Sequence, residues 1–177
     1  MPFFVSSKME HIVLVEPDEN YLDQFLEMAR EYQDAGEDRY QAALEDAVEY
    51  IAGLRRLAQG TDLPSHLVRE SAFWPLRVSR ILGQVRLRHE LNDSLKIEGG
   101  HIGYDVRPSE RRKGYGTLML GLALEKARAI GLHRVMITCD ADNIASAKII
   151  ETNGGVRTAT VISPRSGKPI YQYWIDL

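Results

Sequence analysis

Apolar and polar positions recur with two different periods along the chain, and together they predict a mixed α/β protein. Apolar residues at every third or fourth position indicate helices, whereas alternation or short β-branched runs indicate strands. The helical spacing predicts helices at 17–33, 40–58, 115–131 and 142–155. The strand patterns predict strands at 9–15, 71–78, 81–91, 101–106, 133–140, 156–163 and 168–177.

The order of these elements favours a fold of the α/β class, with one mixed sheet and a single domain over residues 1–177. A strand, two helices and three strands precede a helix, a strand, a second helix and two final strands. The strand at 101–106, the helix at 115–131 and the strand at 133–140 form a central β-α-β unit, flanked by antiparallel strands and helices. The last two strands flank the sequence PRSG and are expected to form a hairpin.

The composition is that of an ordinary soluble protein and excludes several classes of function. Apolar residues make up 44% and charged residues 27% of the chain, and Cys139 is its one cysteine, so no internal disulfide is expected. No apolar run approaches the roughly 18 residues that a membrane span needs. The N-terminal segment shows no signal-peptide pattern, and we expect a cytoplasmic protein with no membrane partner.

The net charge of −3 conceals an uneven distribution along the chain. Residues 1–50 hold 13 acids and 3 bases, and residues 51–177 hold 12 acids and 19 bases. Such a split is typical either of solvated helix faces or of a protein that binds two ligands of opposite sign. The basic part lacks a long basic stripe with interleaved aromatic residues, so we expect no nucleic-acid partner.

The most informative stretch is RPSERRKGYGTLML, in which three cations stand directly before two glycines and the start of a helix. Glycines allow backbone N–H groups to approach an anion closely, and a helix N-terminus adds partial positive charge. A Rossmann dinucleotide loop would need glycine in place of Met119 and a tighter turn after Val106. A P-loop would need the closing G-K-[ST], which is absent. The pattern favours a pyrophosphate site.

Arg111 to Gly116, with the sequence RRKGYG, resembles the [QR]-x-x-G-x-[GA] signature of the GNAT superfamily of acyl-CoA N-acyltransferases. The segment from Asp142 to Gly154, DNIASAKIIETNG, is similar to another recurring helix of that family, N-x-x-A/S-x-x-x-Y-x-x-x-G. Together the two motifs cover about residues 98–155, in the expected element context. The resemblance implies the acyl-CoA N-acyltransferase fold and an enzyme that moves the acetyl group of acetyl-CoA to a primary amine by direct attack.

The resemblance also implies where the cofactor binds. The backbone of the signature loop would hold the pyrophosphate of coenzyme A, the strand before the loop would pair with the pantetheine arm, and the start of the later helix would lie along that arm. That strand and the strand at 133–140 would splay apart to make room for the thioester. The implied cofactor-binding residues are Tyr104, Asp105, Val106, Arg111, Arg112, Lys113, Gly114, Tyr115, Gly116, Thr117, Asn143 and Ser146.

The chain departs from the family pattern at both proton-transfer positions. The usual glutamate falls near Gly100, and the usual tyrosine is Ile150. Glu98 and His101 are the nearest titratable groups and the candidates for a general base. Tyr171 or Tyr173 could replace the missing acid, and Cys139 could carry the acetyl group, although a small buried hydrophobe is the simpler interpretation of that cysteine. The histidines lack ligand spacing, and we expect no metal.

The acceptor is expected to be a small-molecule or peptide amine. One hypothesis is that acids of the first two predicted helices attract a cationic amine. These acids are Glu37, Asp38, Glu45, Asp46 and Glu49. The departures at Gly100 and Ile150 leave a second interpretation open, that of a non-catalytic acyl-CoA-binding or sensing module. The C-terminal strands would also allow a homodimer.

Overall fold

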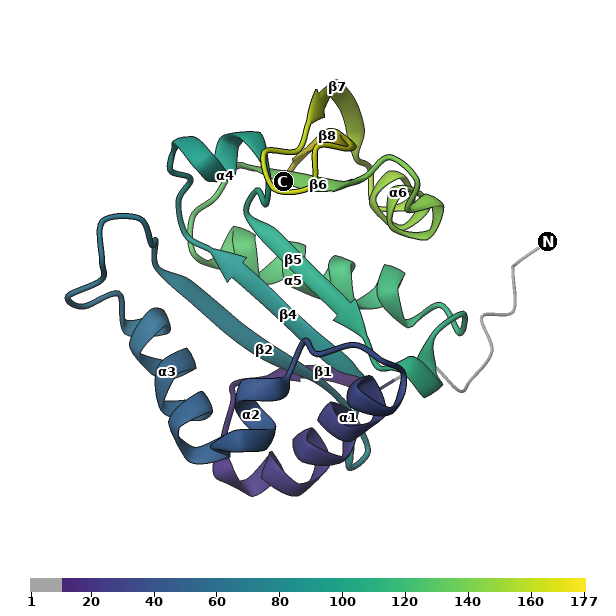
Figure 1. Ribbon diagram of the computed structural model, residues 1–177. Helices are drawn as coiled ribbons and strands as arrows, with labels where there is room; N and C mark the ends of the chain where they lie inside the picture. The colour runs from purple at the N-terminus through teal and green to yellow at the C-terminus, as the bar shows by residue number, and fades with distance from the viewer. Residues whose placement is uncertain (1–10) are drawn as a thin grey trace.

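The computed structural model describes residues 11–177 and contains two β-sheets (Figure 1). The first sheet has the strand order β1-β2-β4-β5, with β3 paired to β2, and the second has the order β6-β8-β7. All pairs within the sheets are antiparallel. The strands are β1 (Ile12–Val15), β2 (Glu70–Arg77), β3 (Arg80–Ile81), β4 (Gly83–Arg88), β5 (Ile102–Val106), β6 (Arg134–Asp140), β7 (Val156–Ile162) and β8 (Pro169–Asp176).

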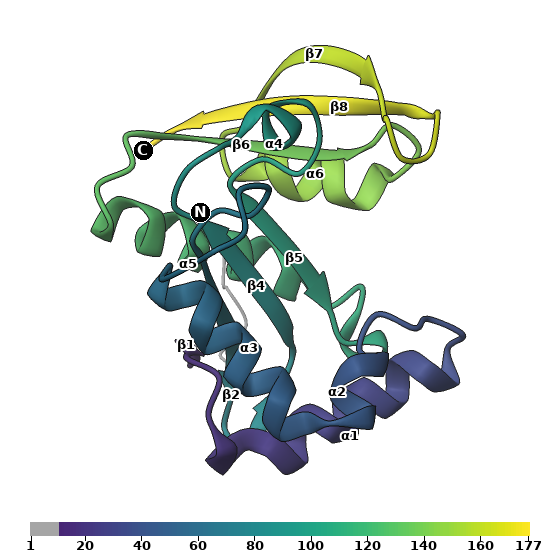
Figure 2. The ribbon, with the colours of Figure 1, turned by 60° about the vertical axis from the view of Figure 1, so that its left-hand side comes forward.

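Helices cover both faces of the first sheet (Figures 1 and 2). The first three α-helices pack on one face around the buried residues Phe25, Tyr32 and Trp74. Helix α5 packs on the other face, where Met119 and Leu120 are fully buried. The helices are α1 (Leu22–Asp34), α2 (Gln41–Glu45), α3 (Ala47–Gln59), α4 (Asp93–Ile97), α5 (Tyr115–Ala129) and α6 (Ile144–Thr152), with short 3-10 turns η1 (Glu19–Tyr21) and η2 (Pro108–Glu110).

The predicted mixed α/β architecture and its central β-α-β unit are present, but β5 and β6 belong to different sheets. The two strands are joined only by an isolated bridge between Gly100 and Ile137, just before β5 begins. From there the strands diverge, so that β5 keeps a strand neighbour, β4, on one side only. The divergence creates the space in which the candidate site lies.

Three local predictions differ from the structure. The helix expected at 40–58 is interrupted at Asp46, whose extended backbone and side chain cap α3 by accepting the N–H of Glu49. The connector at 92–100 contains α4, capped by Asn92. The two-residue strand β3 pairs with the end of β2 and is separate from β4, although its second residue, Ile81, belongs to the predicted strand at 81–91. The strand predicted from Met9 is observed from Ile12, and Met9 and Glu10 lie outside the described residues.

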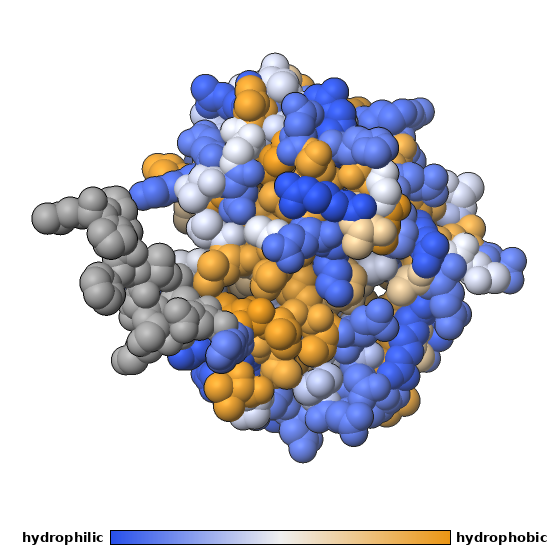
Figure 3. All heavy atoms as spheres, turned by 180° about the vertical axis from the view of Figure 1, so that it is seen from behind, coloured by the Kyte–Doolittle hydropathy of each residue, from blue (hydrophilic) through white to orange (hydrophobic). Residues whose placement is uncertain are grey.

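The face of the first sheet on which α5 lies carries apolar side chains that are only half-buried among the described residues. The half-buried residues Ile12, Leu14 and Leu118 pack there against the core. In the space-filling view from behind, apolar side chains gather on one part of the surface (Figure 3). None of the helices described is long and apolar enough to cross a bilayer.

Candidate active site

The loop between β5 and α5 makes a sharp turn that depends on glycine. Gly114 has a φ of +85° and Arg112 a φ of +61°, both in the left-handed region that favours glycine. Gly116 lies in the first turn of α5, where a Cβ atom would come within 2.6 Å of the Ile149 side chain. Gly114 therefore permits the turn into the helix, and Gly116 permits the close approach of α6.

The backbone N–H groups of this turn are free to bind an anion. Within the described part of the chain, the amides of residues 112–114 donate no hydrogen bond. The N-terminus of α5 has no side-chain cap, so its first amides also lack a partner. The positive ends of these N–H dipoles and of the helix dipole all face the space beside the loop. This arrangement favours the binding of a phosphate group there.

The three cations of the signature loop have different partners. Arg111 lies with its Nη2 atom 2.8 Å from Glu37, and Lys113 lies with its Nζ atom 3.0 Å from Glu110. Arg112 is exposed and makes no ion pair with any described residue. Arg112 is therefore the cation of this loop that is most available to a bound anion.

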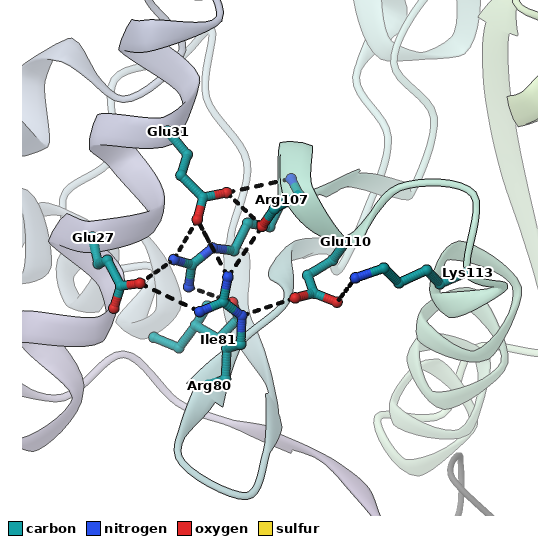
Figure 4. A network of polar contacts seen from close by, with 8 residues as sticks. Glu27, Glu31, Arg80, Ile81, Arg107, Glu110 and Lys113 are labelled. Atoms are coloured by element: carbon teal, nitrogen blue, oxygen red, sulfur yellow. Dashed lines mark hydrogen bonds and ion pairs between the residues drawn. The ribbon is translucent and has the colours of Figure 1, made fainter.

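Below the loop, a buried ion-pair network fixes its start to α1 (Figure 4). Arg107 is fully buried, and its guanidinium donates to Glu31 and Glu27 at 2.8 and 2.7 Å. Ser109 also donates to Glu31, through its hydroxyl at 2.7 Å. Burial opposes the ionisation of Glu31, but the hydrogen bonds from Arg107 and Ser109 outweigh it and lower the pKa from 4.5 to about 2. The network thus holds the start of the loop against α1.

A cavity of about 810 Å³ lies above the loop, between β5 and α6. Every predicted cofactor-binding residue except Lys113 lines it; Lys113 is turned instead toward Glu110. The lining residues from the predicted set are Tyr104, Asp105, Val106, Arg111, Arg112, Gly114, Tyr115, Gly116, Thr117, Asn143 and Ser146. We call this space the cofactor cavity.

A second cavity of about 350 Å³ occupies the gap between β5 and β6, and we call it the acceptor cavity. Its walls come from β4, β5, β6, the end of α4 and the β7–β8 turn. The two cavities share a wall formed by Arg39, Tyr104, Asn143 and Ser146. Tyr104 and Ser146 are in contact there, with their hydroxyl oxygens 2.9 Å apart. The gap therefore connects the cofactor cavity, beside the signature loop, with the smaller acceptor cavity.

Comparison of the sequence with known protein families shows which family has a site of this kind. The family model described as an acetyltransferase (GNAT) domain matches residues 11–156. The chain belongs to the GNAT acetyltransferase family. This membership confirms the predicted fold, the predicted acetyl-CoA-dependent N-acetyltransferase function and acetyl-CoA as the cosubstrate.

Solved structures of GNAT acetyltransferases share this fold at low sequence identity. RimL, a ribosomal L7/L12 α-N-protein acetyltransferase solved with coenzyme A, matches with a TM-score of 0.73 at 15% identity, over 96% of both chains. Mycobacterium smegmatis RimJ matches with 0.72 at 17% identity, over 93% of this chain and 81% of its own. The microcin C7 self-immunity acetyltransferase MccE, solved with acetyl-CoA and AMP, matches with 0.71 at 15% identity, over 95% and 93%. No protein of curated function matches the sequence.

The two candidate bases of this GNAT chain occupy different environments. Glu98 lines the acceptor cavity, accepts a hydrogen bond from Ser163 at 2.7 Å and forms an ion pair with Arg165 at 3.0 Å. His101 lines neither cavity; its Nδ1 atom accepts the N–H of Met136 at 2.9 Å. Burial lowers the pKa of His101, which keeps the ring neutral. Glu98 therefore borders the acceptor cavity, whereas His101 stabilises the backbone of β6 through its hydrogen bond with Met136.

The departures from the family pattern have local physical reasons. At Gly100 a Cβ atom would lie 2.3 Å from the carbonyl oxygen of Met136, because the chain here crosses β6 at the isolated bridge. A glutamate cannot occupy that position without moving the strand. Ile150 is fully buried in the core against which α6 packs. Neither position therefore offers a group to the reaction.

The tyrosines considered as replacement acids do not line either cavity. The Tyr173 hydroxyl donates to Glu151 at 3.0 Å, and Tyr171 packs under the guanidinium of Arg157. Tyr104, which sequence reasoning placed along the cofactor only through its backbone, has the better position. Burial raises its pKa to about 12, so its hydroxyl remains protonated at neutral pH.

A hydrogen-bonded cluster around the buried carboxylate of Asp105, which lines the cofactor cavity, is not apparent from the sequence. Asp105 accepts hydrogen bonds from Tyr32 at 2.7 Å and Tyr40 at 2.8 Å, and Arg39 lies 4.0 Å away. Its side chain is only 8% exposed, and burial raises its pKa. These partners are more than 60 residues distant in sequence, so no local pattern could have revealed the cluster. No group of histidine, cysteine or carboxylate side chains suited to a metal occurs among residues 11–177.

Proposed function

We propose that the enzyme transfers the acetyl group where the two cavities meet, at the contact between Tyr104 and Ser146. The observation that carries this proposal is the wall that the cofactor cavity and the acceptor cavity share. The signature loop would hold the pyrophosphate through the free amides of residues 112–114, with Arg112 beside them. The thioester would then extend along β5 to Tyr104, and an amine in the acceptor cavity would attack its carbonyl carbon.

Direct attack is favoured over an acetyl-cysteine intermediate. Cys139 lines the acceptor cavity, but burial raises its pKa to about 11. Since the thiolate is the nucleophilic form, the cysteine is almost wholly unreactive at neutral pH. A Cys139→Ala variant is therefore expected to retain acetyl transfer.

The proton of the ammonium group must leave before attack, because an alkylamine has a pKa near 10.4. Glu98 is the carboxylate we propose for this role, through water, since it borders the acceptor cavity. When the carbon–sulfur bond breaks, the thiolate of coenzyme A departs. Ser146 or Tyr104 would donate a hydrogen bond that stabilises this thiolate, and the thiolate would take up, through water, a proton that the attacking nitrogen loses.

The acceptor is proposed to be a small-molecule or peptide amine. RimL, which has the same fold, is an α-N-acetyltransferase of the ribosomal protein L7/L12, and this supports a peptide acceptor. A cytoplasmic location and a homodimer through the C-terminal strands stay predictions.

The test is an assay of free thiol released from acetyl-CoA in the presence of a panel of primary amines. We expect turnover with at least one amine, and about 10- to 100-fold lower kcat in Ser146→Ala and Tyr104→Phe with little change in the affinity for coenzyme A. Tight binding of acetyl-CoA without turnover on any amine would instead support an acyl-CoA sensor.

A further inference from the structure

The acceptor cavity has an excess of positive charge, and this excess bears on which amine the proposed acetyl transfer uses. Among the described residues, its charged lining consists of Arg39, Arg86, Arg88, Arg165, Glu98 and Asp140. The hypothesis that early acids attract a cationic amine finds no support here. None of Glu37, Asp38, Glu45, Asp46 and Glu49 lines this cavity.

Two of the four arginines already have acidic partners. Arg88 lies with its Nε atom 2.8 Å from Glu70 and also donates to the carbonyl of Gly100 at 3.0 Å. Arg165 lies 3.0 Å from Glu98. Their charges are compensated within the protein, so they form the wall of the cavity and need no ligand.

Arg39 is only weakly compensated. Its Nη1 atom lies 4.0 Å from Asp105, whose carboxylate already accepts hydrogen bonds from Tyr32 and Tyr40. Its side chain is 44% exposed, and it lies on the wall common to the two cavities. The guanidinium therefore retains donors for a bound group.

Of the four arginines that line the acceptor cavity, Arg86 is the one without an acidic partner among the described residues. It makes no ion pair with any residue from 11 to 177, and its Nε atom is buried with no hydrogen-bond acceptor. A buried, unpaired guanidinium donor is unfavourable, and a bound carboxylate or phosphate would satisfy it with two parallel hydrogen bonds.

The position of Arg86 relates the anion to the reacting amine. Arg86 is paired in register with Gly103, where a Cβ atom would lie 3.7 Å from its Nη2 atom. Because Gly103 has no side chain, the space between the guanidinium and the cavity stays open. Tyr104, at the proposed site of transfer, is the next residue of β5; its side chain points to the opposite face of the sheet, and both Tyr104 and Arg86 line the acceptor cavity.

We infer that the acceptor is an amine that carries a carboxylate or phosphate group a few bonds from its nitrogen, bound by Arg86 with Arg39 beside it. This inference rests on the proposed acetyl transfer. The acceptor cavity would then bind a substrate that carries both an amine and an anionic group. Such a substrate would be either a free amino acid-like molecule or a peptide with an acidic first residue.

The test compares amines of matched size that differ in charge. The small-molecule arm uses 5-aminopentanoate, pentylamine and 1,5-diaminopentane, and the peptide arm uses amidated peptides that begin with Asp, Asn or Lys. We expect kcat/KM to be about 10- to 100-fold higher for the acidic member of at least one arm. Arg86→Gln should abolish that preference while leaving the KM for acetyl-CoA unchanged, and Arg86→Lys should retain part of it. Arg30→Gln, which removes an exposed arginine of α1, is the matched control and should keep the preference.

A higher kcat/KM for the cationic members, or an unchanged acidic preference in Arg86→Gln, would overturn the inference. If no amine is acetylated, the proposed function fails, and calorimetry decides the inference separately. Binding of the acidic amines to the coenzyme A-saturated protein, lost in Arg86→Gln, would support it. Equal binding by both proteins would contradict it.

Discussion

The Nη2 atom of Arg107 lies 2.6 Å from Oε1 of Glu31, and this contact joins the segment that follows β5 to helix α1. It brings together residues 76 positions apart in the chain, next to the loop that is proposed to bind pyrophosphate. The acidic first part of the sequence and the basic second part thus meet in an internal network, which explains part of the uneven charge distribution.

Replacement of Arg107 by Met is expected to lower both stability and cofactor affinity. The variant leaves Glu27 and Glu31 without their buried partner and frees the start of the loop. Since both acids keep some contact with solvent, we expect a loss of about 1–3 kcal/mol in the free energy of unfolding. Urea denaturation and calorimetry with coenzyme A measure the two effects. Arg157→Met, a substitution of an exposed arginine on β7, is the control. Unchanged stability and affinity in Arg107→Met would show that the network does not anchor the loop.

The lowered pKa of Glu31 predicts a specific dependence of stability on pH. The unfolded state takes up the proton near pH 4.5, whereas the folded state resists it until about pH 2. The contribution of Glu31 is therefore complete above about pH 5 and is lost as the pH falls from about 5 to 2, by up to about 3 kcal/mol. Glu31→Gln should show a correspondingly smaller loss over this range. Parallel curves of unfolding free energy against pH for the two proteins would contradict the assignment.

Substitutions at Gly114 test the proposed anion site. Gly114→Asp places a carboxylate where phosphate is expected to bind, whereas Gly114→Asn has nearly the same shape and no charge. Both Asn and Asp tolerate a positive φ better than other side chains. We expect Asp to reduce the affinity for coenzyme A at least about 10-fold more than Asn, measured as the rise in Tm at a fixed ligand concentration. Equal effects of the two residues would point to a purely steric role for the glycine.

Glu98 and His101 are expected to behave differently when they are replaced. Glu98→Gln should lower kcat/KM by about 10²–10⁴-fold. Ser163→Ala, which removes a neighbour of Glu98 but not the carboxylate, serves as the comparison and should keep most of the activity.

His101→Asn can still accept the Met136 N–H and should retain activity. His101→Ala cannot, and it should lose about 1–3 kcal/mol of stability. An inactive but stable His101→Asn variant would return His101 to the list of candidate bases.

Local signals in the sequence were sufficient to predict the cofactor side of the site but not the acceptor side. The glycines and cations before α5 are adjacent in sequence, so their chemistry can be inferred without a structure. The break at Asp46 also had a local signal, since Asp46 and Glu49 form the Asp-x-x-Glu pattern of a helix start. The cluster around Asp105 and the unpaired Arg86 depend on how distant strands and helices come together, and no local pattern contains that information.

One face of β4 shows how the acceptor side arises. Gln84, Arg86 and Arg88 alternate with the buried Val85 and Leu87 and lie on the same face of the strand. The structure places Gln84 under the helices, where it accepts a hydrogen bond from Trp74, while the two arginines line the acceptor cavity. Helices α1 to α3 cover only part of this face of β4, and the part that they leave uncovered forms a wall of the acceptor cavity.

The divergence of β5 from β6 has a consequence for the order of events in catalysis. If each substrate has its own cavity, as proposed, and the two cavities meet at the wall of Arg39, Tyr104, Asn143 and Ser146, neither substrate needs to depart before the other enters. The kinetics should therefore be sequential, through a ternary complex. A bisubstrate compound, in which a short bridge joins an amine to the sulfur of coenzyme A, should span both cavities. Such a compound should compete with both acetyl-CoA and the amine.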